Sequence, residues 1–233
     1  MIVSQLWRYP VKSLRGESVQ RASFEAGGIA FDRRYVVLDP NPMRQGKPLT
    51  GRLDKRLLAY SSFVDGEGVR VRTPSGRECG VEEQAWLDEL AREIGSPVVL
   101  ERSDGPIHDD ADVLVVSASS IAALAGEYGA HVDRLRFRPN IVLDGIDLKP
   151  FAENAWEGKT FAVGEALFEA VHTCGRCVMT TIDPETLDMD PKFLRLVVEK
   201  HNAQFGMYFR IARAGTLSVG DAWTAMTEVE ANS

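Results

Sequence analysis

Residues 168–184 read FEAVHTCGRCVMTTIDP, a Cys-x-x-Cys pair between two runs rich in β-branched and aromatic residues. Such runs favour strands on both sides of the pair. We therefore expect Cys174 and Cys177 on a loop or a strand edge, without a helix N-terminus. In the N-terminal part of the chain, further strand-like runs cover residues 2–9, 19–24, 35–38, 57–64 and 69–73. Strands in series with few helices between them predict a β-rich α+β fold or a β-barrel, not a doubly wound parallel sheet.

The clearest helix is predicted over residues 82–94, where five apolar side chains fall on one face. They are Trp86, Leu87, Leu90, Ala91 and Ile94. Gly95 ends this helix and Pro97 prevents its continuation. We take it as the seam between an N-terminal β-rich domain, residues 1–100, and a C-terminal β-rich domain, residues 101–228. Residues 229–233 are then a short tail.

Two further helices are expected in the C-terminal part. Ser117 has the side chain of an N-cap, and the helix after it is predicted to end at Gly126. Another is expected from Pro191 to about Lys200, within a region where strands otherwise dominate from Asn140 onward.

Composition excludes several classes of protein. With 27 basic and 34 acidic residues among 233, the net charge of −7 disfavours a nucleic-acid binder, which needs a basic surface. No apolar run approaches the roughly 20 residues of a membrane span. An odd number of cysteines, three, argues against a disulfide framework and for a reducing compartment. We expect a soluble cytoplasmic protein that has no membrane span and does not bind nucleic acid.

The Cys-x-x-Cys pair has several chemical interpretations. A closed zinc site needs four ligands, and only His172 lies near enough in sequence to supply a third. A thioredoxin-like pair needs a helix N-terminus, which the strand-like flanks do not offer. Two partly buried thiols in a β-turn are a further alternative. Arg176 between the cysteines favours a thiolate, the form that a soft, high-valent metal binds.

Two basic segments near the N-terminus contain the parts of a phosphate site. Lys12 and Ser13 lie in the segment PVKSLRG, residues 10–16, where backbone N–H groups near a glycine could add donors. Arg33 lies in the segment DRR, residues 32–34, and adds a cation. Solvated surface charges are the alternative for both segments.

A third cluster, RFRPNIV, occupies residues 136–142. Pro139 fixes the chain just before a strand, so Arg138 and Asn140 emerge at a rigid corner. A guanidinium and an amide together suit a phosphate or the edge of a heterocycle.

Taken together, these segments resemble the molybdenum-cofactor sulfurase C-terminal (MOSC) domain family with its N-terminal β-barrel companion. The match is nearest to the mitochondrial amidoxime-reducing component and its bacterial relatives. The resemblance covers essentially the whole chain. Its motifs are YPVKS at 9–13, FDRRY at 31–35, FRPNI at 137–141, CGRCVMTTIDP at 174–184, QFGMYF at 204–209 and GTLSVGD at 215–221.

The resemblance implies that this chain binds the molybdenum cofactor, Mo-molybdopterin, and has no need of pyridoxal phosphate. Cys177, the second cysteine of the pair, would ligate molybdenum. The residues that would bind the phosphate or the pterin are Lys12, Ser13, Arg33, Ser117, Arg138, Asn140, Thr180 and Thr181. The resemblance also implies a MOSC-type β-barrel with an N-terminal β-barrel-like subdomain and a few helices.

Two functions are compatible with this resemblance. The first is a molybdenum-dependent reductase of small compounds with an N–O or S–O bond, N-hydroxylated compounds above all. In it, Asp183 orients a water or shuttles a proton; an Asx-Pro turn at Asp183 is the alternative. Three cysteines cannot also hold a four-cysteine cluster, so electrons would come from a separate cytochrome b5-like, flavin reductase or ferredoxin-like protein. The second function is a cofactor or sulfur carrier with a persulfide on Cys177.

Overall fold

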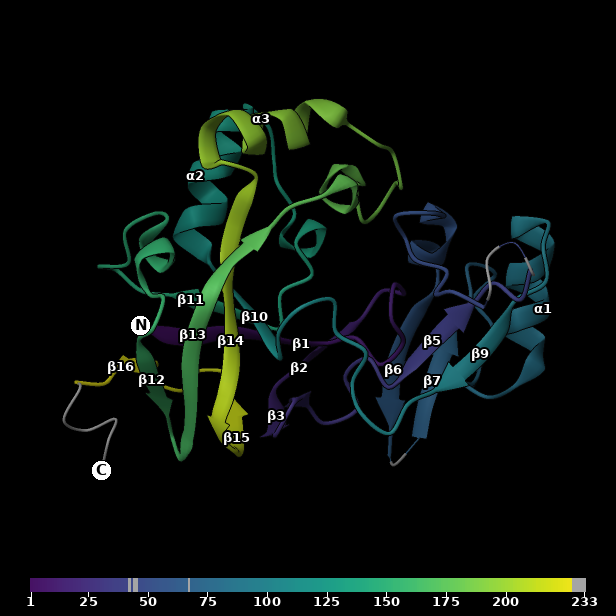
Figure 1. Cartoon of the computed structure of the whole chain (residues 1–233), viewed down its shortest axis with the longest axis horizontal. Coiled ribbons are helices and arrows are strands. Elements are labelled where there is room, and N and C mark those ends of the chain that lie inside the picture. Colours follow the sequence, from purple (N-terminus) through teal and green to yellow (C-terminus); the bar gives the residue numbers. More distant parts are fainter. Residues whose placement is uncertain (42, 44–45, 67, 228–233) are drawn as a thin grey trace. The chain divides into compact units, whose positions relative to one another are not determined.

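The computed structural model describes residues 1–41, 43, 46–66 and 68–227, which form two compact units (Figure 1). Unit 1 contains Met1–Trp7, Ser18–Ala30 and the chain from Asp110 onward, and unit 2 contains Arg8–Glu17 and Phe31–Asp109. The predicted tail, residues 229–233, lies outside the described residues. Strands predominate in both units, which confirms the β-rich α+β fold class.

Unit 1 is built on an eight-stranded mixed sheet. Its strands, in spatial order, are β16 (Thr224–Ala225), β12 (Thr160–Val163), β13 (Ala166–Gly175), β14 (Gln204–Arg213), β10 (Val113–Ser117), β11 (Ile141–Asp144), β1 (Ile2–Arg8) and β2 (Glu17–Val19). The pair β10–β11 is parallel, whereas β13 and β14 form a long antiparallel ribbon, drawn green and yellow in Figure 1. A smaller sheet has the order β15 (Gly215–Ser218), β3 (Arg21–Glu25) and β4 (Gly28–Ile29). The aromatic core of the unit includes Trp156, Phe161, Phe168, Phe209 and Trp223.

Two helices of unit 1 pack over a second core. They are α2 (Ala118–Tyr128) and α3 (Pro191–His201), and their buried contacts include Leu124, Phe193 and Val197. Ser117 caps α2 through its side chain, as predicted. The predicted end at Gly126 is wrong: α2 continues to Tyr128 and is followed by Gly129, whose φ of 77° permits the left-handed C-cap. Short 3-10 helices are η2 (Arg134–Arg136), η3 (Ala152–Ala155) and η4 (Val178–Thr181).

Unit 2 has two small sheets and one helix around a core of its own. The sheets are β5 (Tyr35–Leu38) with β9 (Val99–Arg102), and β6 (Ser61–Asp65), β7 (Gly68–Arg72) and β8 (Glu78–Gly80). The predicted helix is confirmed as α1 (Gln84–Ile94), which buries Trp86, Leu87 and Leu90 and ends at Gly95. The strand predicted over 57–64 is wrong in its first part, because the Asp54 carboxylate accepts from Arg56 N–H and caps the 3-10 helix η1 (Lys55–Ala59).

The two units do not follow a single cut through the chain. The sequence predicts one boundary between residues 100 and 101, whereas two N-terminal segments lie in unit 1. Strand β1 pairs with β11, so that Leu6 faces Ile141, and β3 pairs with β15, so that Ala22 faces Leu217. These pairings join strands far apart in sequence, which a local pattern does not reveal.

Candidate functional site

The two cysteines of the Cys-x-x-Cys pair occupy different environments. Cys174, near the end of β13, is buried with 3% of its surface exposed, and Cys177 is partly exposed. Cys177 is the N-cap residue of η4. The prediction of a strand after the pair is therefore wrong. The hydroxyls of Thr180 and Thr181 donate to the carbonyls of Cys177 (2.9 Å) and Val178 (2.7 Å), and such local bonds compete with strand pairing.

Arg136 holds η4 in place, a role that the sequence analysis missed. Its guanidinium donates to the carbonyls of Thr180 (3.2 Å) and Thr181 (3.1 Å) and to Asp183 Oδ2 (2.8 Å). The side chain is only 7% exposed and lies over the ring of Phe193. Its one sequence signal is its place two residues before Arg138 in the basic cluster.

The sequence suggested that Arg176 favours a cysteine thiolate, but its guanidinium bonds to backbone carbonyls elsewhere. Its guanidinium donates to the carbonyl oxygens of Phe205 (2.8 Å from Nε) and Phe137 (3.1 Å), and it lies over both rings. Since these contacts connect the segment after β13 to β14 and to the end of η2, Arg176 stabilises the local fold.

Asp183 forms an Asx turn, which is the alternative to a catalytic role that the sequence left open. Its Oδ1 accepts from the N–H groups of Glu185 (2.9 Å) and Thr186 (3.1 Å), and its Oδ2 pairs with Arg136. Burial raises the pKa of Asp183, but the two N–H donors and the charge of Arg136 outweigh burial and lower it below the ordinary value. Asp183 is therefore an ionised anchor of the turn.

Two other residues predicted to bind the cofactor are committed to the interior of unit 1. Asn140 is 1% exposed, and its side chain accepts from Leu114 N–H (3.2 Å) and donates to the Trp7 carbonyl (3.3 Å). Ser117 is 1% exposed and its hydroxyl contacts Ser120 and the buried Glu153. Both side chains tie backbone segments together, a role that their sequence context does not distinguish from ligand binding.

In unit 2, the two predicted phosphate-binding segments lie side by side. Lys12 N–H donates to the Tyr35 carbonyl (2.8 Å), and Arg33 N–H donates to the Tyr9 carbonyl (2.8 Å). The fully buried Asp32 accepts from Tyr9 N–H (2.6 Å) and pairs with the guanidinium of Arg33, which lies 5.1 Å from the Tyr9 ring centroid. The structure thus brings Lys12, Ser13 and Arg33 together.

A carboxylate sits among these cations. Asp109 bridges Lys12 Nζ (2.6 Å) and Arg52 (2.6 Å) through its two oxygens. Burial raises the pKa of Asp109, but Lys12, Arg52 and Arg33 together lower it below the ordinary value. The sequence analysis missed both Asp109 and Arg52, since neither lies in a recognisable motif.

Three of the predicted cofactor-binding residues have a left-handed backbone. Their φ angles are 70° for Ser13, 49° for Arg33 and 54° for Arg138. This conformation is uncommon outside glycine, and it costs about 1–3 kcal/mol where it occurs. Strained residues of this kind are found at ligand-binding sites, but the same conformation also occurs at Phe31, Phe151, Leu187, Asn202 and Ala203, so by itself it does not mark a site.

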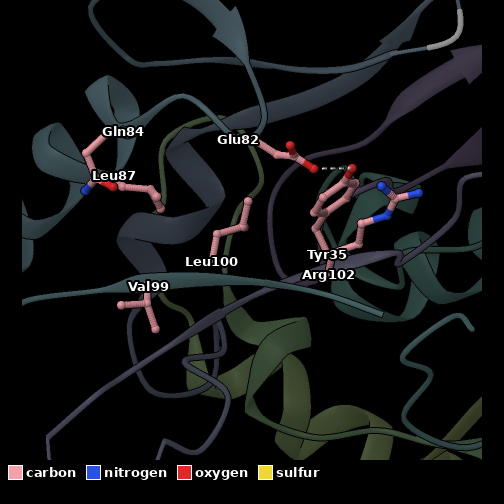
Figure 2. Close-up of a pocket in the computed structure, with 7 residues that line it drawn as sticks. All are labelled: Tyr35, Glu82, Gln84, Leu87, Val99, Leu100 and Arg102. Atoms are coloured by element: carbon pink, nitrogen blue, oxygen red, sulfur yellow. Dashed lines mark hydrogen bonds between the residues drawn. The ribbon is translucent and has the colours of Figure 1, made fainter. Parts of the chain in front are cut away.

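Unit 2 also contains a cavity of about 310 Å³. Figure 2 shows its lining residues, which are Tyr35, Glu82, Gln84, Leu87, Val99, Leu100 and Arg102. The Tyr35 hydroxyl donates to Glu82 Oε1 (3.3 Å), and burial together with Glu82 raises the pKa of Tyr35. The lining contains none of the predicted site residues.

The described residues contain neither a metal-ligand cluster nor a helix suited to span a membrane. No three His, Cys, Asp or Glu side chains are grouped so that they could hold a metal ion, and His172, the candidate third zinc ligand, contacts Asp110 at 3.4 Å. No helix in this part of the chain has the length and apolarity of a membrane span.

Comparisons with known proteins agree with the motifs. The MOSC N-terminal β-barrel domain model matches residues 1–117, and the MOSC domain model matches residues 102–224. The chain is 27% identical to the human mitochondrial amidoxime-reducing component 1 and 26% identical to the bovine component 2, and each alignment covers 94% of this chain and 81% of the relative. The crystal structure of the YuaD protein from Bacillus subtilis has a similar fold, with a TM-score of 0.54 at 15% identity over 96% of this chain and 94% of that one. The chain therefore belongs to the MOSC family and carries both the N-terminal β-barrel domain and the MOSC domain.

Proposed function

We propose that this chain is a molybdenum-cofactor-dependent reductase of small N-hydroxylated compounds. The observation that carries the proposal is the difference between the two cysteines. Cys177 presents a partly exposed thiol at the start of η4, a segment held by Arg136, whereas Cys174 is buried. One accessible thiolate on a rigid turn is the donor that molybdenum needs beside the two sulfurs of a dithiolene. The amidoxime-reducing relatives supply the reaction class.

Each unit has its own part in this proposal. In unit 1, Cys177 binds the metal, Arg138 contacts the pterin, and Arg136 and Asp183 keep the turn of η4 rigid. In unit 2, Lys12, Ser13 and Arg33 bind the phosphate through charge-assisted hydrogen bonds. When bound, the cofactor would supply the two-electron chemistry that reduces an N–O bond.

The four remaining predicted contacts act differently in this proposal. Thr180 and Thr181 shape η4 through their hydroxyls, while Ser117 and Asn140 fix the backbone. Electrons come from a separate donor protein of the cytochrome b5-like, flavin reductase or ferredoxin-like kind. A cytoplasmic location stays a prediction.

Metal analysis of paired cysteine variants tests the proposal. The chain is produced in a host that makes the cofactor, and molybdenum and pterin are measured for wild type, Cys177→Ser and Cys174→Ala. Alanine suits position 174 because that site is buried and apolar. We expect Cys177→Ser to lose molybdenum and benzamidoxime reduction with an artificial electron donor, and Cys174→Ala to keep both.

Other outcomes have distinct meanings. Equal molybdenum in all three proteins would exclude Cys177 as the ligand. Loss of activity in both variants at full cofactor content would indicate a dithiol mechanism. A fully loaded wild type that reduces no N–O or S–O compound would favour the carrier function, with a persulfide on Cys177.

A further inference from the structure

In unit 2, the cations Lys12, Arg33 and Arg52 surround two carboxylates that are held very differently. Asp32 is fully buried and bonded to Tyr9 N–H and Arg33, so it is a permanent part of the fold. Asp109 keeps 47% of its side chain exposed and lies in the segment between β9 and β10, outside any helix or strand. Rotation of the Asp109 side chain would therefore break its two ion pairs without disturbing a strand.

Arg52 belongs to the same cluster on geometric grounds. Its guanidinium contacts one oxygen of Asp109 while Lys12 contacts the other, each at 2.6 Å. Arg33 adds its charge to the same carboxylate. Two cations from separate segments thus contact one carboxylate, and the charge of a third acts on it.

We propose that Asp109 is an internal anion that occupies the phosphate-binding position of unit 2, and that Arg52 is a further phosphate-binding residue there. This inference rests on the proposed function, which assigns the phosphate to Lys12, Ser13 and Arg33. It adds a competitor and a fourth side chain that the family motifs do not include.

The charges of the cluster match a phosphate once Asp109 withdraws. Lys12, Arg33 and Arg52 face Asp32 and Asp109, which leaves one net positive charge. Without Asp109 the remaining groups carry two net positive charges. A phosphate monoester carries a charge of about −1.5 to −2 near neutral pH. Like charges at such distances repel, so the phosphate and the Asp109 carboxylate exclude each other. The Asp109 carboxylate keeps these clustered cations from repelling one another.

Titration of the cofactor-free chain with inorganic phosphate tests this inference. Calorimetry at low ionic strength compares wild type, Asp109→Asn, Asp109→Ser and the double variant Asp109→Asn/Arg52→Gln. We expect both single variants to bind phosphate about tenfold more tightly than wild type, because one competing charge-assisted contact is removed. Restoring weak binding in the double variant would identify Arg52 as a ligand.

Asp65→Asn is the matched control. It changes the net charge by the same amount, at an exposed position where β6 ends. We expect its phosphate affinity to equal that of wild type. Without phosphate, Asp109→Asn should melt at a lower temperature than wild type, and added phosphate should remove this difference. Asp65→Asn should show neither effect.

The results separate this inference from the proposed function. Unchanged phosphate affinity in Asp109→Asn and Asp109→Ser would overturn the inference. The proposed function has its own test, in which Lys12→Ala lowers the pterin content of protein from a cofactor-producing host. If Lys12→Ala keeps full pterin content, the phosphate assignment itself fails, whatever the Asp109 variants show.

Discussion

At the scale of single residues, a left-handed backbone occurs both inside and outside the proposed site. Ser13 and Arg33 carry a left-handed backbone in segments that a cofactor phosphate is proposed to contact. The same conformation occurs at Ala203, outside the proposed site, where it follows the end of α3. Ser13 and Ala203 therefore allow backbone strain and ligand binding to be measured independently.

Ser13→Gly should make the chain more stable and bind the cofactor less well. Glycine adopts a positive φ without a steric penalty, so relief of strain should raise the free energy of unfolding by up to about 1 kcal/mol. Loss of the hydroxyl should lower the pterin content. Ala203→Gly should give a similar stabilisation at unchanged pterin content, as measured by urea unfolding and pterin analysis. A full pterin content in Ser13→Gly would remove Ser13 from the site.

At the scale of elements, the 3-10 helix η4 depends on one arginine from another part of unit 1. Arg136 contacts the last two η4 carbonyls and the Asp183 turn, so a single buried cation holds the C-terminal end of η4 and the turn that follows it. We regard Arg136 as a positioning residue for the thiol.

Arg136→Gln should lower the free energy of unfolding by about 2 kcal/mol, because buried carbonyls and the Asp183 carboxylate lose a charged donor. It should also lower the molybdenum content, although the variant still carries Cys177. Arg210→Gln, which breaks an exposed pair with Glu169, should leave stability close to that of wild type and keep molybdenum. If Arg136→Gln retains full molybdenum, the turn does not position the thiol.

At the scale of the whole molecule, several carboxylates make the fold sensitive to acid. Asp54, Asp109 and Asp183 have pKa values below the ordinary 3.8: burial opposes the shift in each, and hydrogen bonds and nearby arginine or lysine charges outweigh burial. A lowered pKa in the folded state contributes stability that is complete above the unfolded value and is lost as the pH falls through the folded value.

The free energy of unfolding should therefore be steady near neutral pH and decline below about pH 4. Urea unfolding across this range measures the decline. Asp109→Asn should be less stable than wild type at neutral pH, and the difference should shrink in acid because protonation abolishes the same ion pairs in wild type. A difference that persists unchanged at low pH would show that the charge of Asp109 is not the cause.

The sequence by itself determined the features that depend on local patterns. The apolar face of α1, its end at Gly95 and the N-cap at Ser117 follow from periodicity and capping chemistry within a few residues. The order of the motifs also identified the family. The assignment of Lys12, Ser13 and Arg33 to a phosphate site stays a prediction, drawn from the recognisable side chains of their segments.

Only the tertiary structure decided the features that depend on distant partners. It placed β1 beside β11 in unit 1, directed Arg176 to the carbonyls of Phe137 and Phe205, and placed Asp109 between Lys12 and Arg52. A hydrogen bond or ion pair between segments depends on where the folded chain brings them, and residue type at one position carries no record of that distance. The roles of buried polar side chains therefore became visible only when their partners were known.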